Sequence, residues 1–194
     1  MSPVIRNLPL LLCCALFAVG CASSPREFSA QLDEQTGVTV ARADRPLVFY
    51  RNVSARAAHA RDFLHLGPIE INRMGSLRYY LWLGAWSTAP LEDPAAMRDG
   101  FEMVTLFADG EPLQLAIAGW TPGAIGASRD VYTKPVATSA DAYYEVTIDQ
   151  IRLIAEARDL RLTTSGPVQA EYVLWQSQRS GFTSLAAFVG RISL

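Results

Sequence analysis

The three cysteine thiols of this chain all lie within its first 21 residues, around the end of an apolar run. Cys13 and Cys14 lie inside the uncharged run of residues 8–19, whereas Cys21 follows the small residue Gly20 and precedes a polar segment. A membrane-spanning helix needs about 20 apolar residues, so this run is too short to span and has the layout of a secretory signal. Of the three thiols, Cys21 is the one that fits a processing site.

The residues around Cys21 resemble the processing site of bacterial lipoproteins. The box reads Ala18-Val19-Gly20-Cys21, with Ala18 at the position where the family most often has leucine. The resemblance covers about 25 residues and implies cleavage before Cys21, whose sulfur then carries diacylglycerol and fatty acyl chains such as palmitate. Ala22, in place of the aspartate that favours inner-membrane retention, implies the outer membrane, facing the periplasm. The alternative is an ordinary signal cleaved after Gly20 and plain secretion.

Cleavage leaves a mature chain with a weak net charge and a single thiol. Removing residues 1–20 leaves 174 of the 194 residues, with 16 basic side chains against 19 acidic ones, a net charge of −3. This charge gives no strong attraction to nucleic acid, and the length suits one domain with an apolar core. With Cys21 acylated, we expect no disulfide, cysteine-based metal site or redox dithiol, so the core alone must stabilise the fold.

Hydrophobic alternation with a period of two dominates the mature chain. The clearest hairpin is predicted at residues 101–118, where Asp109-Gly110 provides a tight reversal between two alternating segments. Further strands are predicted at residues 36–42, 46–52, 67–73, 77–87 and 143–148, and a second hairpin turns at Ser165-Gly166-Pro167. Residues 119–142, rich in Gly and Pro, are predicted to be a long loop, of a kind that is often functional or mobile.

Three segments have helical spacing instead. They are residues 54–64 after a Ser54 cap, the segment opened by a Thr147-x-x-Gln150 capping box, and residues 181–194, where Phe182, Leu185, Ala186 and Val189 share one side. The predicted fold class is therefore mainly β with helices (α+β), an antiparallel sheet or β-sandwich with two or three packed helices. The predicted organisation is a cleaved signal peptide (1–20), an acylated cysteine with a flexible tether (21–35), and a single β-rich globular domain (36–194).

The most unusual predicted strand covers residues 77–87 and is apolar on both faces. Its even-numbered face carries Arg78, Tyr80, Trp82 and Trp86. One interpretation is a central strand covered on one face by a second sheet and on the other by a helix. The other is an aromatic shelf on which Tyr80, Trp82 and Trp86, with Arg78 nearby, bind a sugar ring, a peptide or a lipid.

Catalytic and metal-binding patterns are weak. His59 and His65, the two histidines, form H-x-x-D-x-x-H with Asp62, which on a helix would spread over about 120° but matches no strong zinc motif. There is no G-x-S-x-G elbow, whereas a glycosidase pair of carboxylates stays open, because any two acidic side chains could meet in the folded chain. We therefore expect no metal and no cofactor, and we assign no catalytic residue.

Residues 42–78 form an arginine-rich stretch, with seven arginines against three acidic residues, whereas residues 92–111 are acidic. A basic face could meet anionic lipid headgroups, lipopolysaccharide phosphates or an acidic partner, because the planar guanidinium suits phosphate. However, 16 of the 17 basic residues of the chain are arginine. A scattered, solvated face is therefore the simpler interpretation.

The predicted function follows from the anchor. We expect a membrane-anchored envelope lipoprotein whose domain is a non-catalytic binding or assembly module, partnered by another envelope protein or an envelope polymer and not by nucleic acid. The alternatives are a periplasmic hydrolase or modifying enzyme acting on cell-wall or lipid material, and a small-molecule or lipid carrier with a cavity between sheet and helix.

Overall fold

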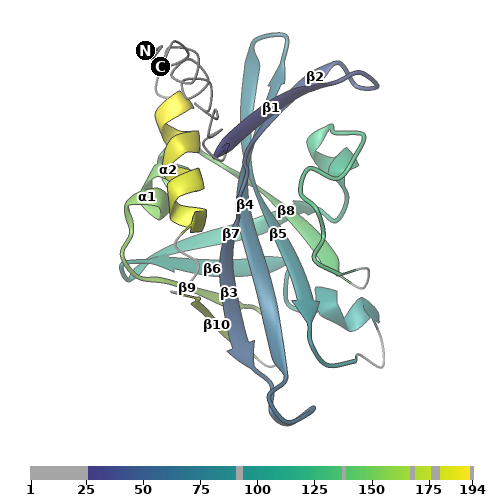
Figure 1. Ribbon diagram of the computed structural model, residues 1–194, viewed down its shortest axis with the longest axis vertical. Coiled ribbons are helices and arrows are strands. Elements are labelled where there is room, and N and C mark those ends of the chain that lie inside the picture. Colours follow the sequence, from purple (N-terminus) through teal and green to yellow (C-terminus); the bar gives the residue numbers. More distant parts are fainter. Residues whose placement is uncertain (1–25, 91–93, 137–138, 167–168, 176–179, 193–194) are drawn as a thin grey trace, which may run out of the picture.

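The computed structural model describes residues 26–90, 94–136, 139–166, 169–175 and 180–192 (Figure 1). Cys21 and the predicted signal segment lie outside the described residues. The strands are β1 (Phe28–Asp33), β2 (Val38–Ala43), β3 (Leu47–Asn52), β4 (Arg61–Arg73), β5 (Ser76–Ser87), β6 (Met103–Ala108), β7 (Glu111–Gly119), β8 (Ala140–Val146), β9 (Leu160–Thr164) and β10 (Glu171–Leu174). The helices are α1 (Ile148–Glu156) and α2 (Ser180–Ile192), and two short 3₁₀ helices are η1 (Pro94–Arg98) and η2 (Pro122–Ile125).

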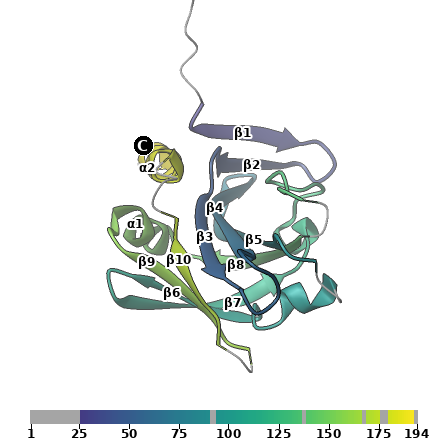
Figure 2. The same ribbon diagram turned by 60° about the horizontal axis from the view of Figure 1, so that its bottom comes forward.

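Eight of the strands close into an antiparallel β-barrel. The order around the barrel is β4-β3-β10-β9-β6-β7-β8-β5, and β5 then pairs with β4 to complete the ring. β4 pairs with two strands along one of its edges: β3 pairs with residues 61–66 of β4, and β2 pairs with residues 69–72. Pro68, which has no N–H to donate, lies between these two paired segments. The β1–β2 hairpin therefore extends beyond the barrel wall (Figure 2).

Alternation along β4 and β5 sends one set of side chains into the barrel. Leu64 and Leu66 of β4 and Leu81 and Leu83 of β5 are at most 2% exposed and belong to the main core. The inward side chains of the other six barrel strands complete this core, to which α1 adds the fully buried Ile151. Burial of these apolar side chains is the main stabilising contribution. The predicted mainly β class with packed helices is confirmed, and the sheet is closed.

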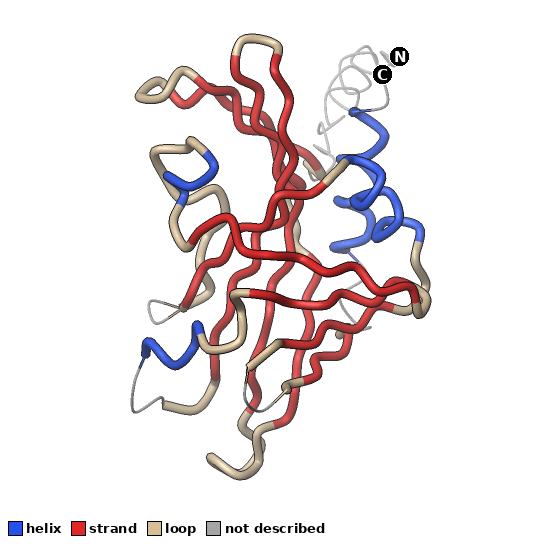
Figure 3. Tube along the Cα trace, turned by 180° about the vertical axis from the view of Figure 1, so that it is seen from behind, coloured by secondary structure: helices blue, strands red, loops and turns tan. Residues whose placement is uncertain are grey.

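The two helices lie together on one side of the barrel, and the loop that contains η2 lies on the opposite side (Figure 3). α2 packs against α1 and against β1 to β4, and its fully buried Phe188 contacts the ring of Phe28 in β1 at a centroid distance of 6.0 Å. Among the described residues, neither helix has the length and apolar character needed to cross a bilayer.

Two local predictions are confirmed in detail. Asp109 and Gly110 join β6 to β7 with positive φ angles of 50° and 90°, the backbone that a tight hairpin turn requires. Thr147 caps α1 by accepting from the backbone N–H of Gln150, while the Gln150 side chain accepts from the backbone N–H of Thr147. The second hairpin (β9–β10) and the C-terminal helix (α2) are also present.

Two other predictions differ from the structure. The predicted helix at residues 54–64 is wrong: the chain makes turns up to residue 60 and then enters β4 at Arg61. Pairing with both β3 and β5 buries Phe63 and Leu64, which outweighs the helical preference of the preceding alanines. The predicted tether at residues 21–35 extends too far, because Phe28–Asp33 is strand β1, paired with β2 along its whole length.

Candidate functional site

The predicted aromatic strand is β5, and its two central aromatic side chains are buried. Tyr80 is 2% exposed and Trp82 is 1% exposed. Trp82 stacks on Tyr132, with ring centroids 4.7 Å apart and planes at 14°, and its Nε1 donates to Asp141 Oδ1 at 2.9 Å. Arg78 is exposed and forms a surface ion pair with Glu145. The outer face of β5 is therefore covered at its centre, by residues from the 120–136 loop in place of the predicted helix.

The covering loop is held against the barrel by specific contacts. Tyr132 donates its hydroxyl to the Pro68 carbonyl at 2.8 Å, and its ring occupies the space where a Cβ at Gly67 would lie. Asp33 accepts from the backbone N–H and the hydroxyl of Ser128 at 2.6 and 2.7 Å, and these bonds hold the pKa of Asp33 at about 2. The loop is thus a fixed cover on this part of the outer face.

Trp86, the last aromatic residue of β5, lies beyond this cover and lines a groove of about 440 Å³ on the outer face of the barrel. Trp86 stacks on Phe63 of β4 with ring centroids 4.5 Å apart and planes at 15°, and Trp175 packs on Phe63 at 5.3 Å. We call this the aromatic groove. Its lining is Arg42, Asp44, Arg45, Pro46, Val48, Phe63, His65, Trp86, Tyr132, Thr133, Pro135, Trp175 and Ser180.

His65 forms part of the floor of the aromatic groove. Burial lowers its pKa to about 4, because the imidazolium would lose hydration there. The Nε1 of Trp86 donates to Nε2 of His65 across a long contact of 3.4 Å, and the two rings meet edge to face. At neutral pH the groove therefore presents a neutral imidazole among aromatic rings.

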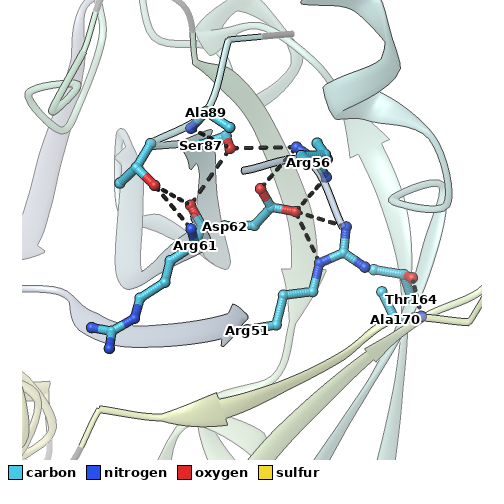
Figure 4. A network of polar contacts seen from close by, with 9 residues as sticks. Arg51, Arg56, Arg61, Asp62, Ser87, Ala89, Thr164 and Ala170 are labelled. Carbon is cyan, nitrogen blue, oxygen red and sulfur yellow. Dashed lines mark hydrogen bonds and ion pairs between the residues drawn. The ribbon is translucent and has the colours of Figure 1, made fainter. Parts of the chain in front are cut away.

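A second hollow, which we call the barrel-mouth cavity, lies where β3 ends and β4 begins. Its volume is about 470 Å³. Asp62, which is 1% exposed, accepts from Arg51 Nε at 2.9 Å and Nη2 at 2.7 Å, and from Arg56 Nη1 at 3.1 Å and Nη2 at 2.8 Å (Figure 4). The lining is Arg51, Arg56, Asp62, Ala96, Met97, Asp99, Phe101, Thr164, Gly166, Ala170 and Tyr172.

The structure separates the histidine and aspartate residues that sequence spacing had grouped. Asp62 points into the barrel, His65 points to the outer face, and His59 is exposed in the turn before β4 at a φ of 63°. Within the ranges that the structure describes, no three His, Cys, Asp or Glu side chains converge as a metal site would require.

Of the residues that line the two hollows, the sequence singled out Trp86, His65 and Asp62, and it placed His65 and Asp62 together as possible metal ligands. The arginine-rich stretch of residues 42–78 contains Arg51 and Arg56, and this excess of arginine was the available signal. No sequence signal connects Trp175 with Trp86, because their proximity depends on the pairing of β10 with β3 and of β3 with β4.

The fold is an eight-stranded antiparallel β-barrel with two additional strands, and its described residues form a groove on the outer face and a cavity at the barrel mouth. Comparison of the chain with protein-family models, with curated proteins and with solved structures found no match.

Proposed function

We propose that this chain is a lipoprotein of the outer membrane, anchored through acylated Cys21 and facing the periplasm. Its barrel acts as a non-catalytic binding or assembly domain for another envelope protein or an envelope polymer. The sequence around Cys21 supports the anchor. The aromatic groove is the observation that carries the binding role.

The groove has the chemistry of a surface that binds rings or extended segments. Its aromatic faces come from Phe63 and Trp86 on neighbouring barrel strands and from Trp175 directly after β10. Such faces bind apolar ring surfaces and lose little conformational entropy, because strand pairing already fixes them. The neutral His65 adds hydrogen-bonding capacity without the cost of desolvating a charge.

The short connection to the anchor restricts where this groove can act. Six residues separate Cys21 from Phe28, the first residue of β1. An extended chain covers at most about 3.5 Å per residue, so Phe28, where the folded domain begins, stays within roughly 25 Å of Cys21. The partner is therefore one that lies at, or reaches, the membrane surface.

Photo-crosslinking in intact cells tests the binding role. A photoreactive residue at Thr133, exposed beside the groove, should yield a discrete adduct, and the same residue at Gln114, exposed on β7, should not. Trp86→Ala should abolish the Thr133 adduct while leaving the amount of folded protein unchanged. Equal labelling from both positions, or an adduct that is insensitive to Trp86→Ala, would show that the groove is not the binding surface.

Fractionation of the full chain tests the anchor separately. Cys21→Ser should move the protein from the membrane fraction to the soluble envelope fraction, and intact-mass analysis of the wild type should show added fatty acyl chains. Cys13→Ser is the matched control and should remain with the membrane, because Cys13 lies within the apolar run. A Cys21→Ser protein that still sediments with membranes, together with an unmodified wild-type mass, contradicts lipid anchoring.

A further inference from the structure

The barrel-mouth cavity has a polar wall that is built and buried, independently of the aromatic groove. Asp62 is 1% exposed and Thr164 is 4% exposed, and both line the cavity. Its volume of about 470 Å³ is within the range of small-molecule sites, which is about 300–1,000 Å³.

The cavity holds more hydrogen-bond donors than its buried carboxylate can accept. Arg51 and Arg56 together carry about ten N–H donors. Asp62 accepts from four guanidinium nitrogens, and Ser87 Oγ accepts from Arg56 Nη1 at 3.4 Å. Arg51 Nη1 has no hydrogen-bond partner among the described residues, and Figure 4 shows it pointing away from Asp62. One carboxylate thus faces two guanidinium groups, and unused donors remain at the cavity wall.

The guanidinium of Arg51 is held in place before any ligand arrives. Its Nε and Nη2 both donate to Asp62, and its Cζ lies 5.1 Å from the centre of the Tyr172 ring. Asp62 is itself fixed on β4, between β3 and β5. Asp62 is therefore a positioning residue, and the fixed guanidinium lowers the entropic cost of binding an oxyanion.

A buried hydroxyl adds a neutral donor to the same cavity. Thr164 Oγ1 accepts from the backbone N–H of Ala170 at 3.1 Å, and none of the described residues accepts its own proton. Buried hydroxyl groups normally have a partner for that proton, so a ligand oxygen would complete the bonding of Thr164.

Apolar side chains make up much of the remaining wall, and one further acidic side chain, Asp99, disfavours a ligand with a high negative charge. Met97, Phe101 and Tyr172 provide an apolar surface suited to a carbon skeleton. Asp99 also lines the cavity and is exposed. A ligand with a single oxyanion group and an apolar body fits this combination better than inorganic phosphate or a polyanion does.

We infer that the barrel-mouth cavity binds a small organic oxyanion, a carboxylate or a phosphate ester, through Arg51, Arg56 and the Thr164 hydroxyl, with its apolar part against Met97, Phe101 and Tyr172. This role goes beyond the proposed partner-binding function and uses none of the residues of the aromatic groove.

Calorimetric titration of the full chain, extracted from membranes in detergent, tests the inference with four probes. Benzoate and phenyl phosphate should bind saturably and more tightly than inorganic phosphate, and benzyl alcohol should not bind. The tighter of the two organic anions identifies a carboxylate or a phosphate ester as the ligand group. If neither organic anion binds, or if benzyl alcohol binds equally well, the inference is overturned.

Variants then locate the site. Arg56→Gln leaves Asp62 paired with Arg51 and should weaken binding of the better anion by about 10- to 100-fold, the usual effect of losing a charge-assisted hydrogen bond. Asp99→Asn should tighten binding by about two- to fivefold, because it removes a like charge. Arg161→Gln is the matched control, since Arg161 is exposed on β9 and pairs with Asp159.

These variants distinguish a binding site from a purely structural charge cluster. A structural cluster would lose stability in Arg56→Gln and would show no anion binding in the wild type. Equal weakening by Arg56→Gln and Arg161→Gln would place the anion elsewhere. Trp86→Ala should leave anion binding unchanged, so failure of this site and failure of the aromatic groove produce different results.

Discussion

His65 links the stability of the barrel to pH through its burial in the wall of the aromatic groove. The pKa of an ordinary histidine is 6.5, and burial lowers that of His65 to about 4. Between these values the unfolded chain binds a proton that the folded chain does not bind. Stability is therefore lost as the pH falls from about 6.5 towards 4, and this contribution becomes constant below the folded-state pKa.

The magnitude follows from the two pKa values. At pH 5 nearly all unfolded chains carry the proton on His65 and about a tenth of folded chains do, which corresponds to a loss of about 2 kcal/mol relative to pH 7.5. At pH 4 the loss approaches about 3 kcal/mol before allowance for the partial exposure of the ring. A domain with a total stability of about 5–15 kcal/mol should show this change clearly.

Urea denaturation of the full chain in detergent at pH 7.5, 6, 5 and 4, followed by circular dichroism, measures this dependence. His65→Phe keeps an aromatic ring beside Trp86 and removes the titrating group, so its stability should decline much less over the same range. His59→Asn replaces the other histidine, in an exposed turn, and should keep the wild-type decline. If wild type and His65→Phe lose stability in parallel, the burial argument for His65 is refuted.

Three further substitutions test other parts of the fold by urea denaturation. In the wild type, the ionised Asp33 stabilises the fold above its unfolded pKa, and this contribution is lost as the pH falls to its folded-state pKa of about 2. Asp33→Asn removes the titrating group, so the fall in stability between about pH 4 and 2 should be smaller. Gly67→Ala places a Cβ 2.3 Å from Tyr132 Cζ and should cost about 1–3 kcal/mol, whereas Gly190→Ala, with open space around the new methyl group, should be neutral or stabilising. Thr147→Ala should cost about 1 kcal/mol through loss of the cap of α1, and an unchanged urea midpoint would contradict that role.

The features that sequence predicts well here are those decided by neighbouring residues. The turn at Asp109-Gly110, the capping box at Thr147 and the two-faced pattern of residues 77–87 each depend on side chains a few positions apart. Closure of the barrel depends instead on the pairing of β4 with both β3 and β5 and on the pairing of β5 with β8. Such long-range pairings leave no local signature, so the alternation of apolar and polar residues does not distinguish a sandwich from a closed barrel.

The exposure of single side chains in the candidate site also depends on residues that are distant in sequence. Trp82 and Trp86 lie on the same face of β5, and alternation alone gives them equal chances of exposure. Tyr132, fifty positions after Trp82, stacks on Trp82 and buries it, whereas Trp86 lies next to Phe63 at the edge of a groove. What distinguishes the two tryptophans is the path of a loop whose own sequence is rich in Gly and Pro and has no repeating pattern.

Strand β4 contributes side chains to both hollows, among them Asp62 to the barrel-mouth cavity and His65 to the aromatic groove. This explains why a helical arrangement of residues 59–65 places these side chains wrongly. On a helix, Asp62 and His65 would lie on the same face, but on β4 an odd spacing sends them to opposite sides of the barrel wall. Asp62 then fixes the guanidinium groups of the mouth cavity, and His65 contributes to the floor of the aromatic groove. Because β4 pairs with β5 along its whole length, neither side chain can shift far without breaking that ladder. We therefore expect both hollows to bind their ligands without rearrangement of the barrel backbone, as preformed sites do.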